Sequence, residues 1–203
     1  MSKYYSNINY YNLKSEDLVN GVLLSNFPTF QQETEYTCAP ACVKMVLAYY
    51  GDTSFSESDL ERECKTRPFP YGTMLKPVND FFVRQGYETF TSIYTKKDND
   101  GLTFSVYEEF RDFVVENLKN GYPIIVENVD YGGHYKVIIG IDVLNDDIQQ
   151  DILIFADPYD SYDGLRDGYN YFPAERFFYM WFDDHCIESE YRLQAFVVVK
   201  NKK

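Results

Sequence analysis

The sequence predicts an α+β fold, because segments with helical periodicity come first and segments with strand character follow. Residues 38–50 and 106–118 place apolar side chains at helical spacing. Three later runs rich in Ile and Val, at 123–129, 134–143 and 151–156, are separated by Gly or Asn/Asp turns, which is typical of antiparallel strands. Helices that precede a set of antiparallel strands indicate the α+β class.

The first predicted elements are a short strand and a buried helix. Residues 22–24 are apolar and end before Phe27-Pro28, so we expect a short strand there. From Cys38 to Tyr50 apolar residues cover most of the helix surface, and Gly51 supplies a C-terminal stop. We therefore expect this helix to be buried on most sides.

Two shorter helical patterns follow. Ser56 precedes a segment with acidic residues in its first turn, as at a capped helix N-terminus. The next pattern covers 74–84 and ends at Gly86. A turn signal at 98–101 then separates these helices from the helix at 106–118.

The C-terminal part predicts a loop, a helix and a last strand. We expect a loop over 157–171, a short aromatic helix over 174–182 and a closing strand over 194–200. The sequence contains no internal repeat and no linker that would divide it. We therefore expect an N-terminal leading segment over 1–23 and a single domain over 24–203.

Composition and charge exclude several classes of protein. The chain has 203 residues, 45% of them hydrophobic, and a chain of this size buries roughly 70% of its unfolded surface without needing disulfides or metal. Its 20 Tyr, 16 Phe and one Trp are unlike a disordered acidic tail. The net charge of −13 argues against nucleic acid and anionic membrane surfaces as partners, because phosphate binding depends mainly on Lys and Arg.

The cysteines and the N-terminus indicate a reducing compartment. The four cysteines have neither CxxC spacing nor the paired His spacing of a structural zinc site, so we expect free thiols; they are Cys38, Cys42, Cys64 and Cys186. The first residues lack a secretory signal, and no apolar run approaches the roughly 20 residues of a membrane span. If Met1 is the natural start, we expect a cytoplasmic protein without metal or other cofactor.

Three residues are suited to nucleophilic catalysis. Cys38 lies at the start of its helix, where Pro40 suits the first turn, and the free N–H groups and dipole of a helix N-terminus favour a thiolate. His134 follows two glycines at the start of an apolar strand. Asp157 ends the next apolar strand, so its carboxylate can accept the imidazole N–H. A thiolate beside an oriented imidazole can attack a carbonyl carbon.

The stretches around these residues resemble the papain-like cysteine peptidases of the bacteriocin-processing, double-glycine-leader family, which are peptidase C39-like. The matching stretches are Gln32-Glu-Thr-Glu-Tyr-Thr-Cys38-Ala-Pro-Ala, Gly133-His134-Tyr-Lys-Val-Ile-Ile-Gly and Phe155-Ala-Asp157-Pro158. The resemblance covers residues from about 24 to 199. It implies a papain-like fold in which the helix of the nucleophile, in an N-terminal helical part, packs on an antiparallel sheet.

The resemblance also implies roles for individual residues. Cys38 is expected to be the nucleophile, His134 the general base and acid, and Asp157 the orienting group. Gln32 is expected to be the side-chain donor of the oxyanion hole, acting with a backbone N–H near Cys38. One departure is Ala39, where the family usually has Gly, and this change concerns substrate fit near the sulfur more than the chemistry.

Several residues have a simpler structural interpretation. Gln31 precedes Gln32 and leaves a one-residue ambiguity in the oxyanion assignment, although the spacing favours Gln32. Cys42, one helical turn after the proposed nucleophile, is expected to pack in the core. Cys64 and Cys186 are expected to have no role in catalysis.

Two acidic regions could bind a metal ion, but hydrogen bonding in turns explains their residues better. His185 has acidic neighbours but no second histidine at ligand spacing, so we expect an exposed polar turn. Four aspartates recur along one segment, namely Asp157, Asp160, Asp163 and Asp167. They lack the alternating pattern and the closing Glu of an EF-hand loop, so calcium binding is the weaker interpretation and turn hydrogen bonds the stronger one.

The sequence therefore predicts a thiol peptidase that acts on a peptide or acyl substrate. Two alternatives stay open: an acyl or peptidyl transferase, in which an amine attacks the thioester, and a non-catalytic peptide-binding module. Because we find no transmembrane or nucleotide-binding segment, we expect a stand-alone peptidase. Acidic residues near the site predict a mild preference for basic or neutral substrates; these are Glu33, Glu35, Asp130 and Asp160.

Overall fold

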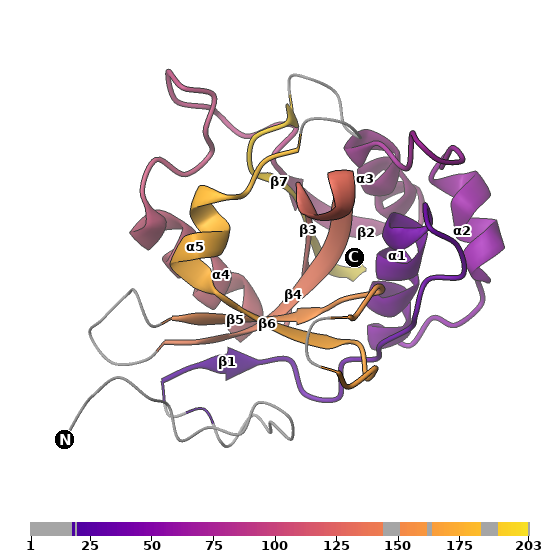
Figure 1. Ribbon diagram of the computed structural model, residues 1–203, viewed down its shortest axis with the longest axis horizontal. Coiled ribbons are helices and arrows are strands. Elements are labelled where there is room, and N and C mark those ends of the chain that lie inside the picture. The colour runs from indigo at the N-terminus through magenta and orange to yellow at the C-terminus, as the bar shows by residue number, and fades with distance from the viewer. Residues whose placement is uncertain (1–17, 19, 144–150, 162–163, 184–190, 203) are drawn as a thin grey trace.

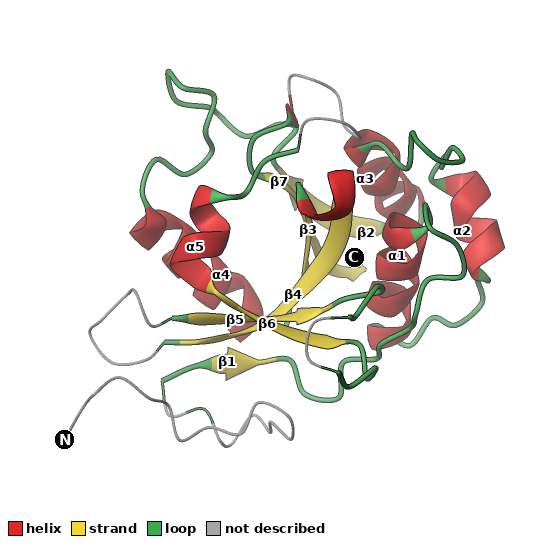
Figure 2. Cartoon of the chain, viewed as in Figure 1, coloured by secondary structure: helices red, strands yellow, loops and turns green. Residues whose placement is uncertain are grey.

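The structure is a computed structural model that describes residues 18, 20–143, 151–161, 164–183 and 191–202. Its described residues form helices and an antiparallel sheet, which confirms the α+β prediction (Figures 1 and 2). The helices are α1 (Cys38–Tyr49), α2 (Glu57–Glu63), α3 (Leu75–Arg84), α4 (Tyr107–Lys119) and α5 (Ala174–Tyr179), with a 3₁₀ turn η3 at Asp130–Gly132. The strands are β1 (Val22–Leu23), β2 (Tyr87–Thr91), β3 (Ile124–Asn128), β4 (His134–Asp142), β5 (Ile152–Ala156), β6 (Tyr169–Pro173) and β7 (Ala195–Lys202).

The sheet places strand β4 at the centre of the fold. The described strands are ordered β2-β7-β3-β4-β5-β6, with β1 paired to the later part of β4, and every pair is antiparallel. Figure 1 shows α1, α2 and α3 on one side of the strands and α4 and α5 on the other. All nine residues of β4 are buried, which explains its run of Val and Ile. The first of them is His134.

Helix α1 is the buried helix that the sequence predicts. Nine of its 12 residues are buried, and it packs against β4. Pro40 is tolerated in the first turn, where an N–H has no intrahelical partner. The side chain of Thr37, the residue before the helix, hydrogen-bonds with Thr34 and does not cap the helix. The N-terminus of α1 is therefore left open.

Most predicted elements are confirmed, with boundaries that differ by at most three residues. The patterns at 74–84 and 106–118 are α3 and α4, and that at 174–182 is α5. Ser56 caps α2 through a capping box with Asp59, as its position indicates. The three apolar runs are β3, β4 and β5, and the closing strand is β7.

Two strands depart from the prediction. Strand β6 begins inside the segment 157–171, which the sequence analysis assigns to a loop, and the same analysis assigns no element to β2. Four of the five residues of β6 are only partly buried or exposed, so no alternation marks it at the edge of the sheet. The pairing of β2 with β7 shifts register between Tyr87 and Thr89, and this irregularity breaks the period-two pattern.

The described cysteines agree with the expected free thiols. Cys38, Cys42 and Cys64 are buried and unbridged, and Cys42 and Cys64 are core residues. Cys186 and His185 lie outside the described residues. Within the described part of the chain, no helix has both the length and the apolar character needed to cross a membrane.

Gln194 holds the segment that leads into α4. Its Oε1 accepts hydrogen bonds from the N–H groups of Thr103 and Phe104, each at 2.9 Å, and its Nε2 donates to the Phe104 carbonyl oxygen at 3.0 Å. The Phe104 ring is thereby stacked on Trp181 and Phe196, with centroids 6.2 and 5.8 Å apart. Because Gln194 is 2% exposed, water cannot replace these bonds.

We expect Gln194→Ala to lower the free energy of unfolding by about 2–4 kcal/mol, because it leaves a buried N–H group, a partly buried N–H group and a buried carbonyl oxygen unpaired. Urea unfolding measures the change. The exposed Lys96, in the same segment, provides the control: Lys96→Ala is expected to change stability by less than about 0.5 kcal/mol. Equal effects of the two substitutions would contradict the role of Gln194.

Candidate active site

Cys38 is the first residue of α1 and is 8% exposed. The available amides of the first turn are those of Cys38 and Ala39, because Pro40 has no N–H and Ala41 N–H already donates to the Thr37 carbonyl oxygen at 3.0 Å. Such N–H groups stabilise negative charge on a nearby thiolate or oxyanion. The sulfur therefore lies where the open helix N-terminus favours an anion.

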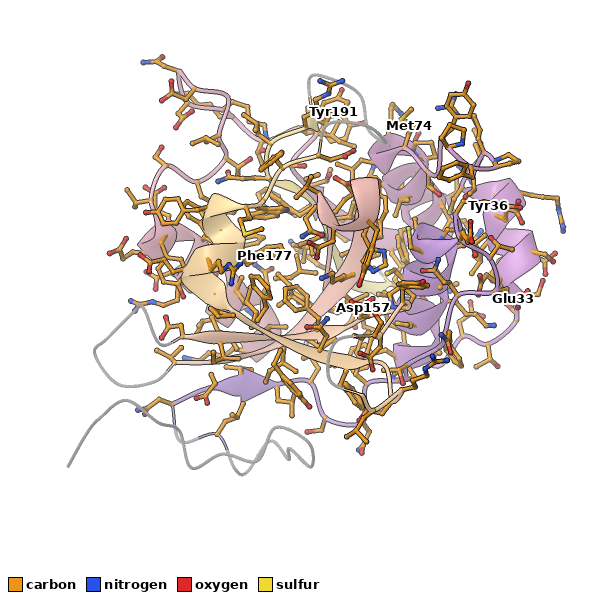
Figure 3. All side chains as sticks on the ribbon, in the orientation of Figure 1. Glu33, Tyr36, Met74, Asp157, Phe177 and Tyr191 are labelled. Atoms are coloured by element: carbon orange, nitrogen blue, oxygen red, sulfur yellow. The ribbon has the colours of Figure 1, made fainter. Side chains whose placement is uncertain are left out.

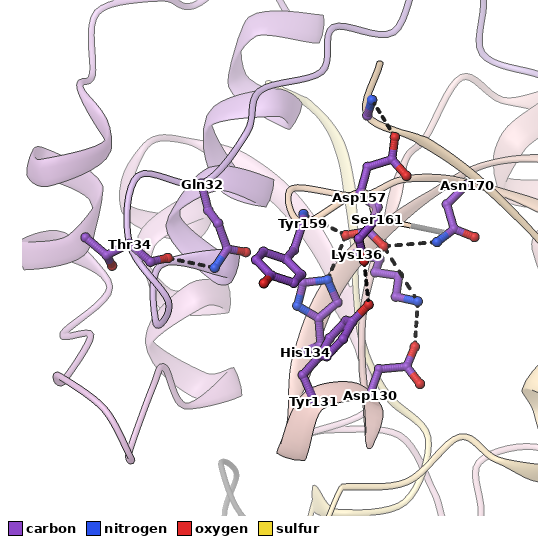
Figure 4. Close-up of polar contacts among 12 residues, drawn as sticks. Gln32, Thr34, Asp130, Tyr131, His134, Lys136, Asp157, Tyr159, Ser161 and Asn170 are labelled. Atoms are coloured by element: carbon purple, nitrogen blue, oxygen red, sulfur yellow. Dashed lines mark hydrogen bonds and ion pairs between the residues drawn. The ribbon is translucent and has the colours of Figure 1, made fainter. Parts of the chain in front are cut away.

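His134 and Asp157 form a buried pair at adjacent strand ends. His134 begins β4, Asp157 follows β5, and the antiparallel pairing of these strands brings the two residues together. Nε2 of His134 is 2.7 Å from Oδ1 of Asp157. The residues are 3% and 1% exposed, and Figure 3 shows Asp157 inside the molecule. Figure 4 shows the contact in detail.

The charges of this pair stabilise each other. Burial alone would lower the pKa of His134, but the hydrogen bond with Asp157 and the interaction with the nearby Cys38 raise it to about 9. Because Nε2 bonds to Asp157, Nδ1 is the ring nitrogen left for the sulfur. Burial opposes ionisation of Asp157, yet the His134 hydrogen bond and the nearby Lys136 charge hold its pKa below the usual value. The geometry therefore favours an imidazolium between a carboxylate and a thiol.

Three further groups surround the Asp157 carboxylate, and the sequence analysis missed them. The Tyr159 N–H donates to Oδ1 at 2.8 Å, and Asn170 Nδ2 donates to Oδ2 at 3.2 Å. Lys136 Nζ lies 3.7 Å from Oδ2. Asn170 lies in β6, so its role was hidden with that strand. Lys136 follows His134 by two positions, and strand alternation is the signal that places both on one face.

Gln32 lies in the same cleft as Cys38, whereas Gln31 lines a separate pocket. The Gln32 side-chain Nε2 donates to the Thr34 carbonyl oxygen at 2.7 Å and keeps a second hydrogen. The backbone N–H of Gln32 donates to the carbonyl oxygen of Pro158 at 2.9 Å. The structure thus brings Gln32 near the other three predicted residues, with its amide turned toward Thr34 (Figure 4).

The cleft over Cys38 and His134 has a volume of about 230 Å³. Its walls are rich in aromatic side chains, which are Tyr36, Phe69, Tyr131, Tyr135 and Tyr159. Phe69 is 75% exposed and Tyr131 is 58% exposed, although both line the cleft. These exposed rings offer apolar surface to a bound chain.

Two tyrosines cover the imidazole. The Tyr131 and Tyr159 rings stand edge-on to His134, with centroids 5.4 and 6.4 Å away, and they contact each other at 5.1 Å. The Tyr131 hydroxyl hydrogen-bonds with Ser161 Oγ at 3.0 Å. Tyr131 has φ 56° and ψ 19°, a left-handed conformation that costs a non-glycine residue roughly 1–2 kcal/mol. Other contacts must hold this turn.

The acidic residues predicted near the site are placed differently from one another. Glu35 lines the cleft, whereas Glu33 is exposed outside it. Asp130 is half-buried against Lys136, and Asp160 is buried. Only Glu35, of these four acidic residues, therefore lines the cleft.

The aspartates of the segment after β5 make turn hydrogen bonds. Oδ2 of Asp160 accepts from the Gly168 N–H at 3.1 Å, and Oδ1 of Asp167 accepts from the Tyr169 N–H at 2.9 Å. These bonds agree with the turn interpretation. Asp163 lies outside the described residues. Among the residues that are described, no group of three metal-ligating side chains occurs.

Comparison with known sequences identifies the family. The sequence pattern of the Peptidase_C39 like family matches residues 24–181, and the chain therefore belongs to this family. Membership of a peptidase family supports a peptidase function. None of the curated proteins matches the chain significantly.

Solved structures of peptidases share the fold. A putative C39-like peptidase from Bacillus anthracis is 19% identical, with a TM-score of 0.58 over 90% of this chain and 99% of that one. The peptidase domain of Streptococcus ComA, a bi-functional ABC transporter of a quorum-sensing pathway, is 19% identical, with a TM-score of 0.54 over 87% and 100%. A double-glycine-motif protease from an AMS/PCAT transporter, solved with its leader peptide, is 16% identical, with a TM-score of 0.52 over 91% and 97%. The papain-like α+β fold is thus the one that the resemblance implied.

The His134–Asp157 pair makes stability depend on pH. The folded pKa of His134, about 9, exceeds the usual value near 6.5, so its contribution is complete below about pH 6.5 and is lost as the pH rises to about 9. The lowered pKa of Asp157 gives a contribution that is present above about pH 4 and is lost as the pH falls through the folded value.

We therefore expect His134→Gln to lower the free energy of unfolding most near pH 6, with the difference from wild type shrinking toward pH 9. Denaturant unfolding at a series of pH values measures it. Lys119→Gln, at an exposed position, controls for the loss of a charge and is expected to show no such trend. A His134→Gln effect of constant size from pH 5 to 9 would contradict the ion pair.

Proposed function

We propose that the chain is a cysteine peptidase that hydrolyses a peptide amide bond through a thioester on Cys38. The observation that carries this proposal is the arrangement of one cleft: Cys38, at an open helix N-terminus, lines it together with His134, whose Nε2 is 2.7 Å from Asp157. Family membership and the leader peptide bound by a structural neighbour support a peptide substrate.

The first step is attack of the Cys38 thiolate on the amide carbonyl carbon. The C–S bond forms while the carbonyl π electrons move to oxygen, which becomes an oxyanion. In this proposal the free backbone N–H groups of the first turn, at Cys38 and Ala39, stabilise this oxygen. Gln32 adds a side-chain donor when its amide turns from Thr34 toward the cleft, or through its second Nε2 hydrogen.

The histidine moves the protons of both half-reactions. His134, as imidazolium, protonates the leaving amine when the tetrahedral intermediate collapses to the thioester. The neutral imidazole then takes a proton from water as the water oxygen attacks the thioester carbon. The C–S bond breaks, the acid product leaves, and the thiolate and imidazolium are restored. Asp157 keeps Nε2 protonated and the ring oriented, so that Nδ1 serves as the reacting nitrogen.

We expect iodoacetamide to label Cys38 faster than Cys42 or Cys64 at neutral pH, because both of those thiols are fully buried and burial raises their pKa. His134→Ala is expected to slow labelling at least tenfold by removing the cation beside the sulfur. Peptide mapping by mass spectrometry identifies the site. Cys64→Ala is the matched control and leaves the rate unchanged, whereas labelling no faster than in the denatured chain opposes the proposal.

A diverse peptide library, incubated with the wild-type chain, is expected to yield cleaved products that Cys38→Ala does not produce. Gln32→Ala is expected to lower kcat/KM by about 10²–10³, the usual loss of one oxyanion donor. Gln31→Ala is its control.

An added amine distinguishes hydrolysis from acyl transfer, because release of free acid alone opposes the transferase alternative. Absence of any product would leave binding, not hydrolysis, as the function of the cleft.

Glu35 is the acidic residue that lines the cleft, so we expect peptides with basic or neutral residues to be cleaved a few-fold better than acidic ones. Glu35→Gln is expected to remove most of this preference. Competition between matched Lys and Glu peptides at low and high salt measures it. The exposed Glu33, outside the cleft, supplies the control substitution Glu33→Gln, and equal turnover of both peptides by wild type would contradict the role of Glu35.

A further inference from the structure

Behind the catalytic groups lies a buried cation that the mechanism does not use. The Lys136 side chain is 3% exposed, and its Nζ is 2.6 Å from Oδ2 of Asp130 and 3.7 Å from Oδ2 of Asp157. A charge is rarely buried without partners, because desolvation strongly opposes it. Lys136 therefore lies between two carboxylates, one of which orients His134 (Figure 4).

The second carboxylate belongs to the turn that leads into His134. Asp130 begins η3, and the residues between it and the histidine all have positive φ: Tyr131 at 56°, Gly132 at 82° and Gly133 at 119°. Backbone hydrogen bonds from Gly132 N–H to Val129 and from Gly133 N–H to Asp130, each 3.0 Å, close the turn itself, and the Asp130–Lys136 ion pair connects it to β4. The same turn sets the Tyr131 ring beside the imidazole.

We propose that Lys136 and Asp130 are positioning residues of this site: the ion pair between the buried lysine and the half-buried aspartate fixes both the Asp157 carboxylate and the turn that carries Tyr131 around His134. The inference rests on the proposed function of the Cys38–His134–Asp157 site. It assigns the pair no contact with the substrate. Its effect is on the orientation and charge of the histidine.

The two members of the pair act on the imidazolium with opposite signs. Charged and titratable groups from several elements surround His134. They are Cys38 of α1, Lys136 of β4, Asp130 and Tyr131 of the turn, and Asp157 and Tyr159 of the segment after β5. The Asp130 carboxylate favours the imidazolium, and the Lys136 ammonium disfavours it. Removing one charge alone therefore shifts the titration of His134, whereas removing both largely restores it.

The titration of the His134 imidazole by NMR tests this inference. The parent form carries Cys38→Ala, so that no thiol titration couples to the ring, and His185→Gln, so that only one histidine signal is present. We expect Asp130→Asn to lower the pKa of His134 by about one unit and Lys136→Met to raise it by about one unit. The double variant is expected to titrate close to the parent, and Lys136→Arg, which keeps the charge, likewise.

Shifts of the same sign in both single variants, or none above about 0.3 unit, would overturn the inference, because opposite charges that act on the imidazole must shift its titration in opposite directions. Circular dichroism checks that each variant is folded. If Lys136→Met does not fold, the other two variants decide. A pKa of His134 that is lowered in Asp130→Asn and returns to the parent value in the double variant supports the inference. Any other outcome opposes it.

The titration needs no substrate and no nucleophile, so its result is independent of the peptidase assay. Opposite shifts in a chain that cleaves no peptide would retain the ion pair as a control of His134 and refute the proposed function. A chain that cleaves peptides but shows no shifts would retain the function and refute the role of the pair.

Discussion

The hydrogen bond between His134 and Asp157 connects the fold to its chemistry. Both groups are almost fully buried, so neither charge is stable there without the other. Their meeting requires the antiparallel pairing of β4 with β5, and the reach of the imidazole to Cys38 requires α1 to pack on β4. An error in the register of either contact would separate the three groups. The core packing of β4 is thus also a condition for the site.

The sequence predicted the site residues that lie beside core helices and strands. It could not predict those that lie on an edge strand or in a turn. Cys38, His134 and Asp157 adjoin strongly apolar segments, and the resemblance assigned roles to them. Asn170 lies on an edge strand without alternation, so nothing in its surroundings indicated that it reaches the carboxylate. Tyr131 adopts a left-handed backbone that tyrosine itself disfavours, and only the tertiary contacts of its turn account for that.

The structures that share this fold are only 16–19% identical to the chain, so the same fold forms from very different sequences. The central strand and the nucleophile helix must fit a close-packed interior. Part of the cleft wall carries no such demand: Phe69, Tyr131 and Tyr159 are exposed residues outside helices α1–α5 and strands β1–β7. Substrate selectivity can therefore change in these segments while the buried machinery stays intact.

The backbone hydrogen bond from Gln32 to Pro158 has a mechanical consequence. It ties the cleft-lining segment at Gln32 directly to the residue that follows Asp157. A displacement of one segment is carried to the other through a single peptide group, with no side chain between them. The position of the Gln32 backbone is therefore coupled to the position of the segment that holds Asp157.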